Sequence, residues 1–168
     1  VLHAVIEEAL ALGELGLVVS GWFHAPAVSP RAVTVVTAEG AEHDVTASWV
    51  RVYREDVLAR VGRPRDRQEN LGFLCALPLP TARGELRLLR FDLGAAGDRW
   101  LRLPTERIAV PGAALAQEIL GRIRAPERLR ERLFEILDGG LGGFIERVVA
   151  ADPRARVGVR ERQFGTPP

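Results

Sequence analysis

The sequence contains no methionine and no lysine, and its 23 basic residues are all arginines. A GC-rich coding sequence explains this bias, and it also explains the high content of alanine, glycine, leucine and valine. The absence of lysine has a chemical consequence, because Schiff-base enzymes and P-loop nucleotide-binding proteins both use a lysine side chain. These 168 residues therefore supply neither chemistry.

Cysteine is nearly absent as well. Cys75 is the only one, which excludes an internal disulfide and a zinc site built from several cysteines. It lies in the apolar stretch 74–77, so we expect a buried structural thiol and not a nucleophile. No apolar run approaches the ~20 residues of a membrane-spanning helix, and the N-terminus lacks the pattern of a signal peptide. We expect a cytoplasmic protein without a membrane span.

The remaining composition is that of a folded chain, with 47% hydrophobic and 27% charged residues. The net charge is only +1, so no overall positive field attracts nucleic acid, and we expect no nucleic-acid partner. The sequence does not begin with methionine, and it ends on the Phe-Gly-Thr-Pro-Pro run at 164–168, which is typical of an interdomain linker. We therefore expect a module of a longer protein.

Residues 1–108 have the pattern of a β-domain. Short segments rich in β-branched and aromatic residues alternate with glycine and proline turns, which predicts an antiparallel Ig-like β-sandwich of seven or eight strands. One short helix is expected at 57–61, with Asp56 as its N-cap and Gly62 as its left-handed stop. Residues 2–12 also have a composition that favours a helix, but we assign them as a strand. The expected strands are 2–12, 14–23, 31–37, 43–47, 48–53, 72–77, 85–93 and 100–103.

Residues 109–153 change to a period of about four, which predicts a C-terminal three-helix segment. Their apolar stripes must pack on each other, on the sandwich or on the remainder of the longer protein. Residues 154–168 are predicted to be a linker towards a missing catalytic domain. The helix signals are Leu115, Ile119 and Ile123; Leu129, Leu133, Ile136 and Leu137 after Pro126; and Leu141, Phe144, Ile145, Val148 and Val149, with stops at Gly139-Gly140 and Asp152-Pro153.

Motifs for catalysis are missing. His3, His24 and His43 lie about twenty residues apart with no carboxylate in a ligand pattern, which favours surface or strand-face positions over a metal site. No Gly-x-Ser-x-Gly and no Asp-x-Asp occurs, so a nucleophile elbow and the usual cation site of nucleotide-sugar transferases are both absent. The Gly-Gly-Leu-Gly-Gly run at 139–143 follows a predicted helix and lacks a lysine, which favours a turn between helices over a phosphate loop. We expect no metal, no cofactor and no enzymatic activity.

Two sets of residues are candidates for contact with other molecules. Trp22, Trp49 and Trp100 are candidates for stacking on sugar rings, although core packing is the commoner fate of strand tryptophans. The predicted helices carry more apolar surface than a small bundle hides, so a protein-interaction surface is expected there. The residues of this surface are Leu129, Leu133, Phe144 and Val148.

One set of spaced motifs resembles a known family. Gly21-Trp22 is followed by a β-rich stretch that ends in Val50-Arg51-Val52, then by Arg54-Glu55-Asp56-Val57 and by Gly72-Phe73. This pattern, which covers about residues 15–77, resembles the N-terminal β-domain ahead of the catalytic domain in large bacterial family 2 glycosyltransferases. Glu55 stands where that family usually has proline. The resemblance implies an accessory domain of an enzyme of glycan or surface-polysaccharide synthesis, whose catalytic residues lie beyond Pro168.

Two functions follow from these observations. The chain either docks on its own glycosyltransferase domain or on a protein partner, or it binds carbohydrate such as the acceptor glycan. We favour docking, because one tyrosine and few asparagine, glutamine or serine side chains are a poor supply for recognising hydroxyl groups.

Overall fold

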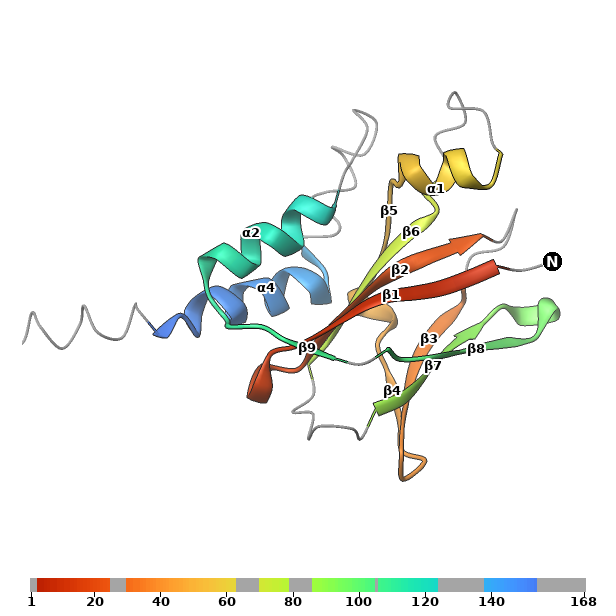
Figure 1. Ribbon diagram of the computed structural model, residues 1–168. Coiled ribbons are helices and arrows are strands. Elements are labelled where there is room, and N and C mark those ends of the chain that lie inside the picture. The colour runs from red at the N-terminus through yellow and green to blue at the C-terminus, as the bar shows by residue number, and fades with distance from the viewer. Residues whose placement is uncertain are drawn as a thin grey trace, which may run out of the picture.

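The computed structural model describes residues 3–24, 30–62, 70–78, 86–104, 106–123 and 138–153. Within these ranges the chain forms nine strands in two sheets and three α-helices (Figure 1). The fold is therefore mainly β with helices, and its sheets are predominantly antiparallel, as the sequence predicted.

Sheet A has five strands in the order β5-β6-β2-β1-β9. All neighbours are antiparallel except β9, which pairs with β1 in parallel. The strands are β5 (Trp49–Val52), β6 (Gly72–Leu77), β2 (Leu17–His24), β1 (His3–Ala11) and β9 (Arg107–Ile108).

Sheet B has four antiparallel strands in the order β4-β3-β7-β8. They are β4 (Glu42–Asp44), β3 (Ala32–Thr37), β7 (Leu86–Asp92) and β8 (Asp98–Arg102). The strand predicted at 43–47 is shorter than expected because Asp44 ends it. The Asp44 carboxylate accepts hydrogen bonds from the backbone N–H and the hydroxyl of Thr46, at 2.8 and 2.6 Å, and a 3₁₀ turn (Thr46–Ser48) follows.

The same five-residue turn joins β1 to β2 and β7 to β8. Its sequence is Leu-Gly-x-x-Gly at Leu12–Gly16 and again at Leu93–Gly97. The first glycines have φ angles of 60° and 61°, a left-handed conformation that a side chain disfavours. In both turns the leucine N–H donates to the carbonyl of the last glycine, at 2.8 and 3.3 Å. This repeated motif fixes the register of one hairpin in each sheet.

The first core lies between the two sheets. Phe91 of sheet B packs its ring against Phe23 and Phe73 of sheet A, with ring centroids 5.3 and 5.7 Å apart. Cys75 is fully buried in this core, as predicted, and burial raises the pKa of its thiol to about 12. At neutral pH this side chain is an apolar thiol.

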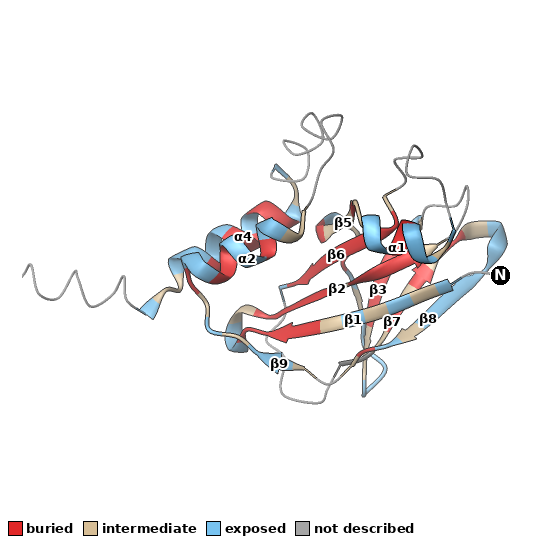
Figure 2. Ribbon diagram, turned by 45° about the horizontal axis from the view of Figure 1, so that its top comes forward, coloured by how far each residue is buried: buried red, intermediate tan, exposed pale blue. Residues whose placement is uncertain are grey.

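A second core covers the opposite face of sheet A. Helices α2 (Ala113–Arg122) and α4 (Gly140–Ala150) pack there, as Figure 2 shows by the buried sides that they turn towards the sheet. This explains why β2 and β6 are apolar along nearly their whole length and do not alternate, since both of their faces are buried. The sheet residues of this core include Leu10, Val18, Leu74 and Ala76, and the helix residues include Ile119, Leu141, Phe144 and Val148.

The placement of α4 corrects two predictions. Phe144 and Val148 were expected on an exposed interaction surface, but they are 1% and 0% exposed because they fill the second core. The glycine run was expected to be a turn between helices, whereas α4 begins at Gly140 and contains the rest of that run. The predicted helix after Pro126, with Leu129 and Leu133, lies outside the described residues.

Helix α1 (Glu55–Arg60) corrects a third prediction. Arg54, and not Asp56, occupies the N-cap position, because the helix begins at Glu55, two residues earlier than predicted. Asp56 therefore lies within the first turn, and its carboxylate accepts hydrogen bonds from the Arg54 guanidinium. Gly62 follows the helix with a φ of 69°, as the sequence predicted.

Two adjacent valines test whether α4 is an integral part of the fold. Val148 is fully buried and Val149 is 43% exposed. We expect Val148→Ala to lower the free energy of unfolding by about 2 kcal/mol, from lost methyl burial plus a cavity. Val149→Ala removes the same atoms from a solvated site and should change stability little. Urea unfolding of both variants measures the difference, and equal effects would contradict the docking of α4 on sheet A.

Candidate functional site

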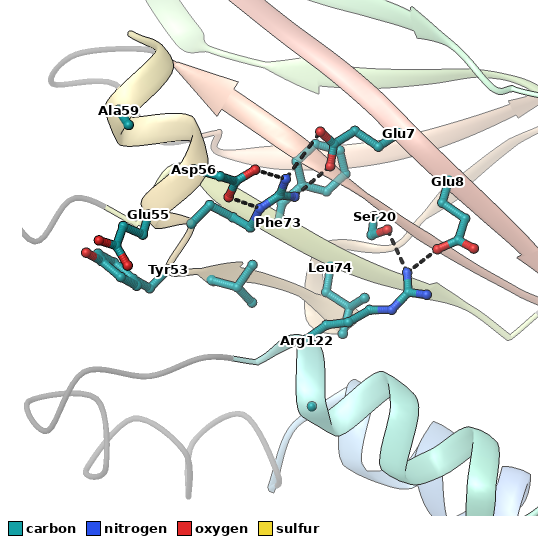
Figure 3. A pocket seen from close by; sticks show the side chains of 13 residues that line it. Glu7, Glu8, Ser20, Tyr53, Glu55, Asp56, Ala59, Phe73, Leu74 and Arg122 are labelled. Atoms are coloured by element: carbon teal, nitrogen blue, oxygen red, sulfur yellow. Dashed lines mark hydrogen bonds and ion pairs between the residues drawn. The ribbon is translucent and has the colours of Figure 1, made fainter. Parts of the chain in front are cut away.

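A groove of about 950 Å³ opens on the helix-covered side of sheet A, between α1 and the end of α2 (Figure 3). We call it the α1–α2 groove. Apolar residues of β5 and β6 form part of its lining, and charged residues surround them. The lining residues are Glu7, Glu8, Ser20, Val52, Tyr53, Arg54, Glu55, Asp56, Ala59, Phe73, Leu74, Gly121 and Arg122.

Helix α1 is held at the rim of this groove by two glycine-aromatic pairs on neighbouring strands. Gly21 is paired with Phe73, and Trp22 with Gly72. The Trp22 side chain is buried against Val57 and its neighbours in α1. A Cβ atom at Gly72 would lie 2.6 Å from the Arg54 Cγ, so the glycine leaves the space in which the Arg54 side chain lies.

Arg54 joins helix α1 to strand β1 through its guanidinium group. It donates to both carboxylate oxygens of Asp56 in α1, at 2.7 and 2.6 Å, and to both of Glu7 in β1, at 2.6 and 3.3 Å. The hydrogen bonds from Arg54 lower the pKa of Asp56 to about 2. The same contacts, that to Asp56 first, raise the pKa of Arg54. This side of the groove is therefore a charged network with fixed geometry.

A second network forms the other side. Arg122, at the end of α2, pairs with Glu8 and donates to the Ser20 hydroxyl at 3.0 Å (Figure 3). It also contacts Glu118 at 2.8 Å, and Arg107 joins Glu8 to Glu118 at 3.0 Å from each. Burial acts to raise the pKa of Glu8, but the hydrogen bonds from Arg122 and Arg107 outweigh it, so this pKa is lowered. The network ties α2 and β9 to β1.

A β-bulge explains how two consecutive residues of one strand reach the same groove. The pairing of β1 with β2 shifts between Ile6 and Glu8, so Glu7 is the extra residue. Side chains of successive strand residues normally point to opposite faces. Here Glu7 and Glu8 both line the groove. Next to the bulge the strands approach closely, since a Cβ on Gly21 would lie 2.1 Å from the Val5 carbonyl oxygen.

The charge of the lining restricts what the groove can accept. Four carboxylates face two guanidinium groups, an excess of two negative charges. Both guanidinium groups are already bound to carboxylates, so the lining disfavours phosphate and other anions. A carboxyl group with a pKa of about 2, as at Asp56, has no proton to donate at neutral pH. The groove suits a group that donates hydrogen bonds or carries positive charge, with an apolar part against Tyr53 and Ala59.

The three tryptophans that were candidates for stacking on sugar rings do not form one site. Trp22 is 9% exposed and lies beneath α1. Trp49 is half-buried against the first core, and its Nε1 has no hydrogen-bond partner in the described part of the chain. Trp100 is 46% exposed on β8, in the other sheet.

Arg51, from the motif resembling the glycosyltransferase domain, also has a structural role. Its guanidinium lies 4.8 Å from the centre of the Phe23 ring and 5.3 Å from that of Trp49, and it donates to the Phe23 carbonyl at 2.8 Å. Burial lowers its pKa to about 10, so it stays charged at neutral pH. It connects β5 to the end of β2.

Sequence reasoning missed most of the groove. Of its charged residues only Arg54, Glu55 and Asp56 belonged to a recognised motif. The positions of Glu7 and Glu8 in the groove depend on a β-bulge that the alternation of the sequence does not reveal. The position of Arg122 depends on the packing of α2. The adjacent pair of acids within an otherwise apolar strand was the one available signal.

None of the helices in the described part of the chain has the length and apolarity needed to cross a lipid bilayer. The described residues also contain no group of three or more histidine, cysteine or acidic side chains arranged to hold a metal ion. Comparison of the chain with protein-family models, with curated proteins and with solved structures gives no match.

The Arg54–Asp56 pair predicts a pH dependence. The pKa of Asp56 is lowered from 3.8 to about 2 in the folded state, so its contribution to stability is present above about pH 4 and is lost as the pH falls to about 2. Asp56→Asn removes this contribution at every pH. We expect the difference in urea midpoint between the native protein and the variant to shrink from pH 5 to pH 2.5. A difference that is constant over this range would contradict the pairing.

Proposed function

We propose that this chain is a non-catalytic accessory module of a bacterial family 2 glycosyltransferase, and that it acts by docking on another protein domain. One observation carries the proposal. Gly21-Trp22, the residues 54–57 and Gly72-Phe73 are far apart in the sequence, yet they meet where α1 packs on sheet A, at the rim of the α1–α2 groove. The pattern that resembles the glycosyltransferase accessory domain thus corresponds to one structural unit.

The groove is the proposed docking surface, and its proposed occupant is an arginine-bearing segment of the transferase domain. The excess of negative charge favours a basic segment, and the apolar surface of Tyr53 and Ala59 favours an aliphatic side chain beside it. Arg54 and Arg122 are held by their own carboxylate partners, so the surface is rigid before the partner binds. We also propose that the protein is cytoplasmic, as expected for an enzyme that uses nucleotide sugars.

The fold assignment belongs to the same proposal. We infer an Ig-like sandwich followed by a three-helix segment, which the packing of Phe91 on Phe23 and Phe73 and the positions of α2 and α4 support. Carbohydrate binding is the second candidate function. The exposed indole of Trp100 favours it, because that side chain lies outside both cores.

The coding sequence beyond Pro168 tests the enzyme context. We expect it to continue within about ten residues into a Val/Ile-rich strand, the first of a nucleotide-binding α/β domain, and then to reach an Asp-x-Asp pair that holds a cation against the nucleotide sugar. A downstream sequence without these two features would remove the glycosyltransferase assignment.

Docking itself is tested by filling the groove. Ala59 is exposed on α1 and lines the groove without taking part in its ion pairs, so Ala59→Trp should obstruct the site and leave the fold intact. We expect this variant to lose at least about tenfold in affinity for the separately expressed downstream domain, measured by calorimetry. Ala114→Trp, at an exposed position of α2 outside the lining, is the matched control and should bind normally. Equal binding by both variants would contradict docking in the groove.

A further inference from the structure

The outer face of sheet B carries an exposed aromatic side chain on a polar surface. Val35, Leu89 and Phe91 point into the first core, so by alternation their neighbours Thr34, Arg90 and Trp100 stand on the opposite face. Thr34 is paired with Arg90, and Arg90 with Trp100, which places the three in one row across the sheet. The described helices α2 and α4 pack on sheet A, on the other side of the sandwich (Figure 1).

The position of the indole is fixed by its neighbours. The Arg90 guanidinium lies 5.4 Å from the centre of the Trp100 ring. Arg90 is itself held by both carboxylate oxygens of Glu42, at 3.0 and 2.9 Å, and it lies 3.5 Å from the Thr34 hydroxyl. Strand β7, which carries Arg90, is the neighbour of β8, and β8 is the edge strand of the described sheet. Trp100 is 46% exposed.

We propose that Trp100, Arg90 and Glu42 form a binding site for one pyranose unit of a neutral glycan. The C–H face of a sugar ring carries partial positive charge and packs on the negative face of an aromatic ring, and indole offers the largest such face. The Glu42 side chain is half exposed and has free lone pairs to accept hydroxyl protons, while Arg90 donates. The pair cancels its own charge, which favours a neutral sugar over an acidic one.

Single exposed apolar side chains are ordinary on protein surfaces, and exposure alone would carry no proposal. Ile108 and Val110 are more exposed than Trp100, and their exposure alone suggests no ligand. Trp100 differs because a guanidinium group lies against its ring and the Glu42 carboxylate holds that guanidinium group in place. An aromatic surface with adjacent hydrogen-bonding groups in fixed positions is what recognition of a sugar requires.

This site gives the second candidate function, carbohydrate binding, a location and a ligand class, and it rests on that candidate; it is separate from the proposed docking function. It lies on sheet B, whereas the α1–α2 groove lies on the far side of sheet A. The two proposals therefore fail separately: Ala59→Trp should leave glycan binding unchanged, and loss of Trp100 should leave docking unchanged.

The test uses affinity electrophoresis and calorimetry of the whole chain with three soluble neutral polysaccharides, a β-glucan, an α-mannan and a galactan. Polygalacturonate serves as the acidic comparator. We expect the native protein to bind at least one neutral polymer. Trp100→Ala should weaken binding about tenfold, and Trp100→Phe should keep part of the affinity because it retains an aromatic face. Ile108→Ala, an exposed change on sheet A, should bind like the native protein.

A measurement on the native protein avoids reliance on the variants. The NMR signal of the Trp100 indole N–H should shift when a neutral polysaccharide that binds the protein is added. The indole signals of the buried Trp22 and the half-buried Trp49 should not shift. Three results would overturn the proposal: no binding to any neutral polymer, unchanged affinity in Trp100→Ala, or preferred binding to polygalacturonate.

Discussion

The fold depends on one constraint, which is that sheet A is apolar on both faces. Strands β2 and β6 place phenylalanine, valine and leucine side chains alternately on the two sides, so neither side tolerates water. Sheet B covers one side and helices α2 and α4 cover the other. The helices are therefore a layer of the domain, and the boundary expected near residue 108 does not separate two independent cores.

The α1–α2 groove follows from the same constraint. Helices α1 and α2 cover different parts of sheet A, and the surface between them cannot stay purely apolar because water reaches it. The chain places ion pairs there, with Arg54 fixed by Glu7 and Asp56 on one side and Arg122 by Glu8 on the other. These pairs anchor the helix ends and also give the groove its acidic, rigid lining. One set of residues thus serves both the packing and the proposed docking.

The sequence was informative where local chemistry decides the structure. The strand at 72–77 was predicted with its observed bounds, because a compact apolar run that is followed by Pro78 has few alternatives, and the helix stop at Gly62 followed from its backbone freedom. The sequence was misleading where long-range packing decides the structure. The apolar stripe with Phe144 and Val148 predicted an exposed surface, since nothing local indicates that sheet A needs a cover on its second face. The groove acids were missed because a β-bulge brings Glu7 and Glu8 to one side.

The tryptophans show the same contrast between what local sequence indicates and what long-range packing decides. Trp22 lies in the apolar strand β2 and Trp100 in β8 among charged residues, yet both were candidates for the same role. The difference is the position of each strand: β2 is internal to a sheet covered on both faces, whereas β8 is an edge strand of a sheet covered on one. That geometry places the α1–α2 groove and the exposed indole of Trp100 on opposite sides of the two packed sheets. A domain held by its sheet A side to a transferase would leave its sheet B side open to a long polymer, so both proposed contacts can exist at once without competing for the same surface.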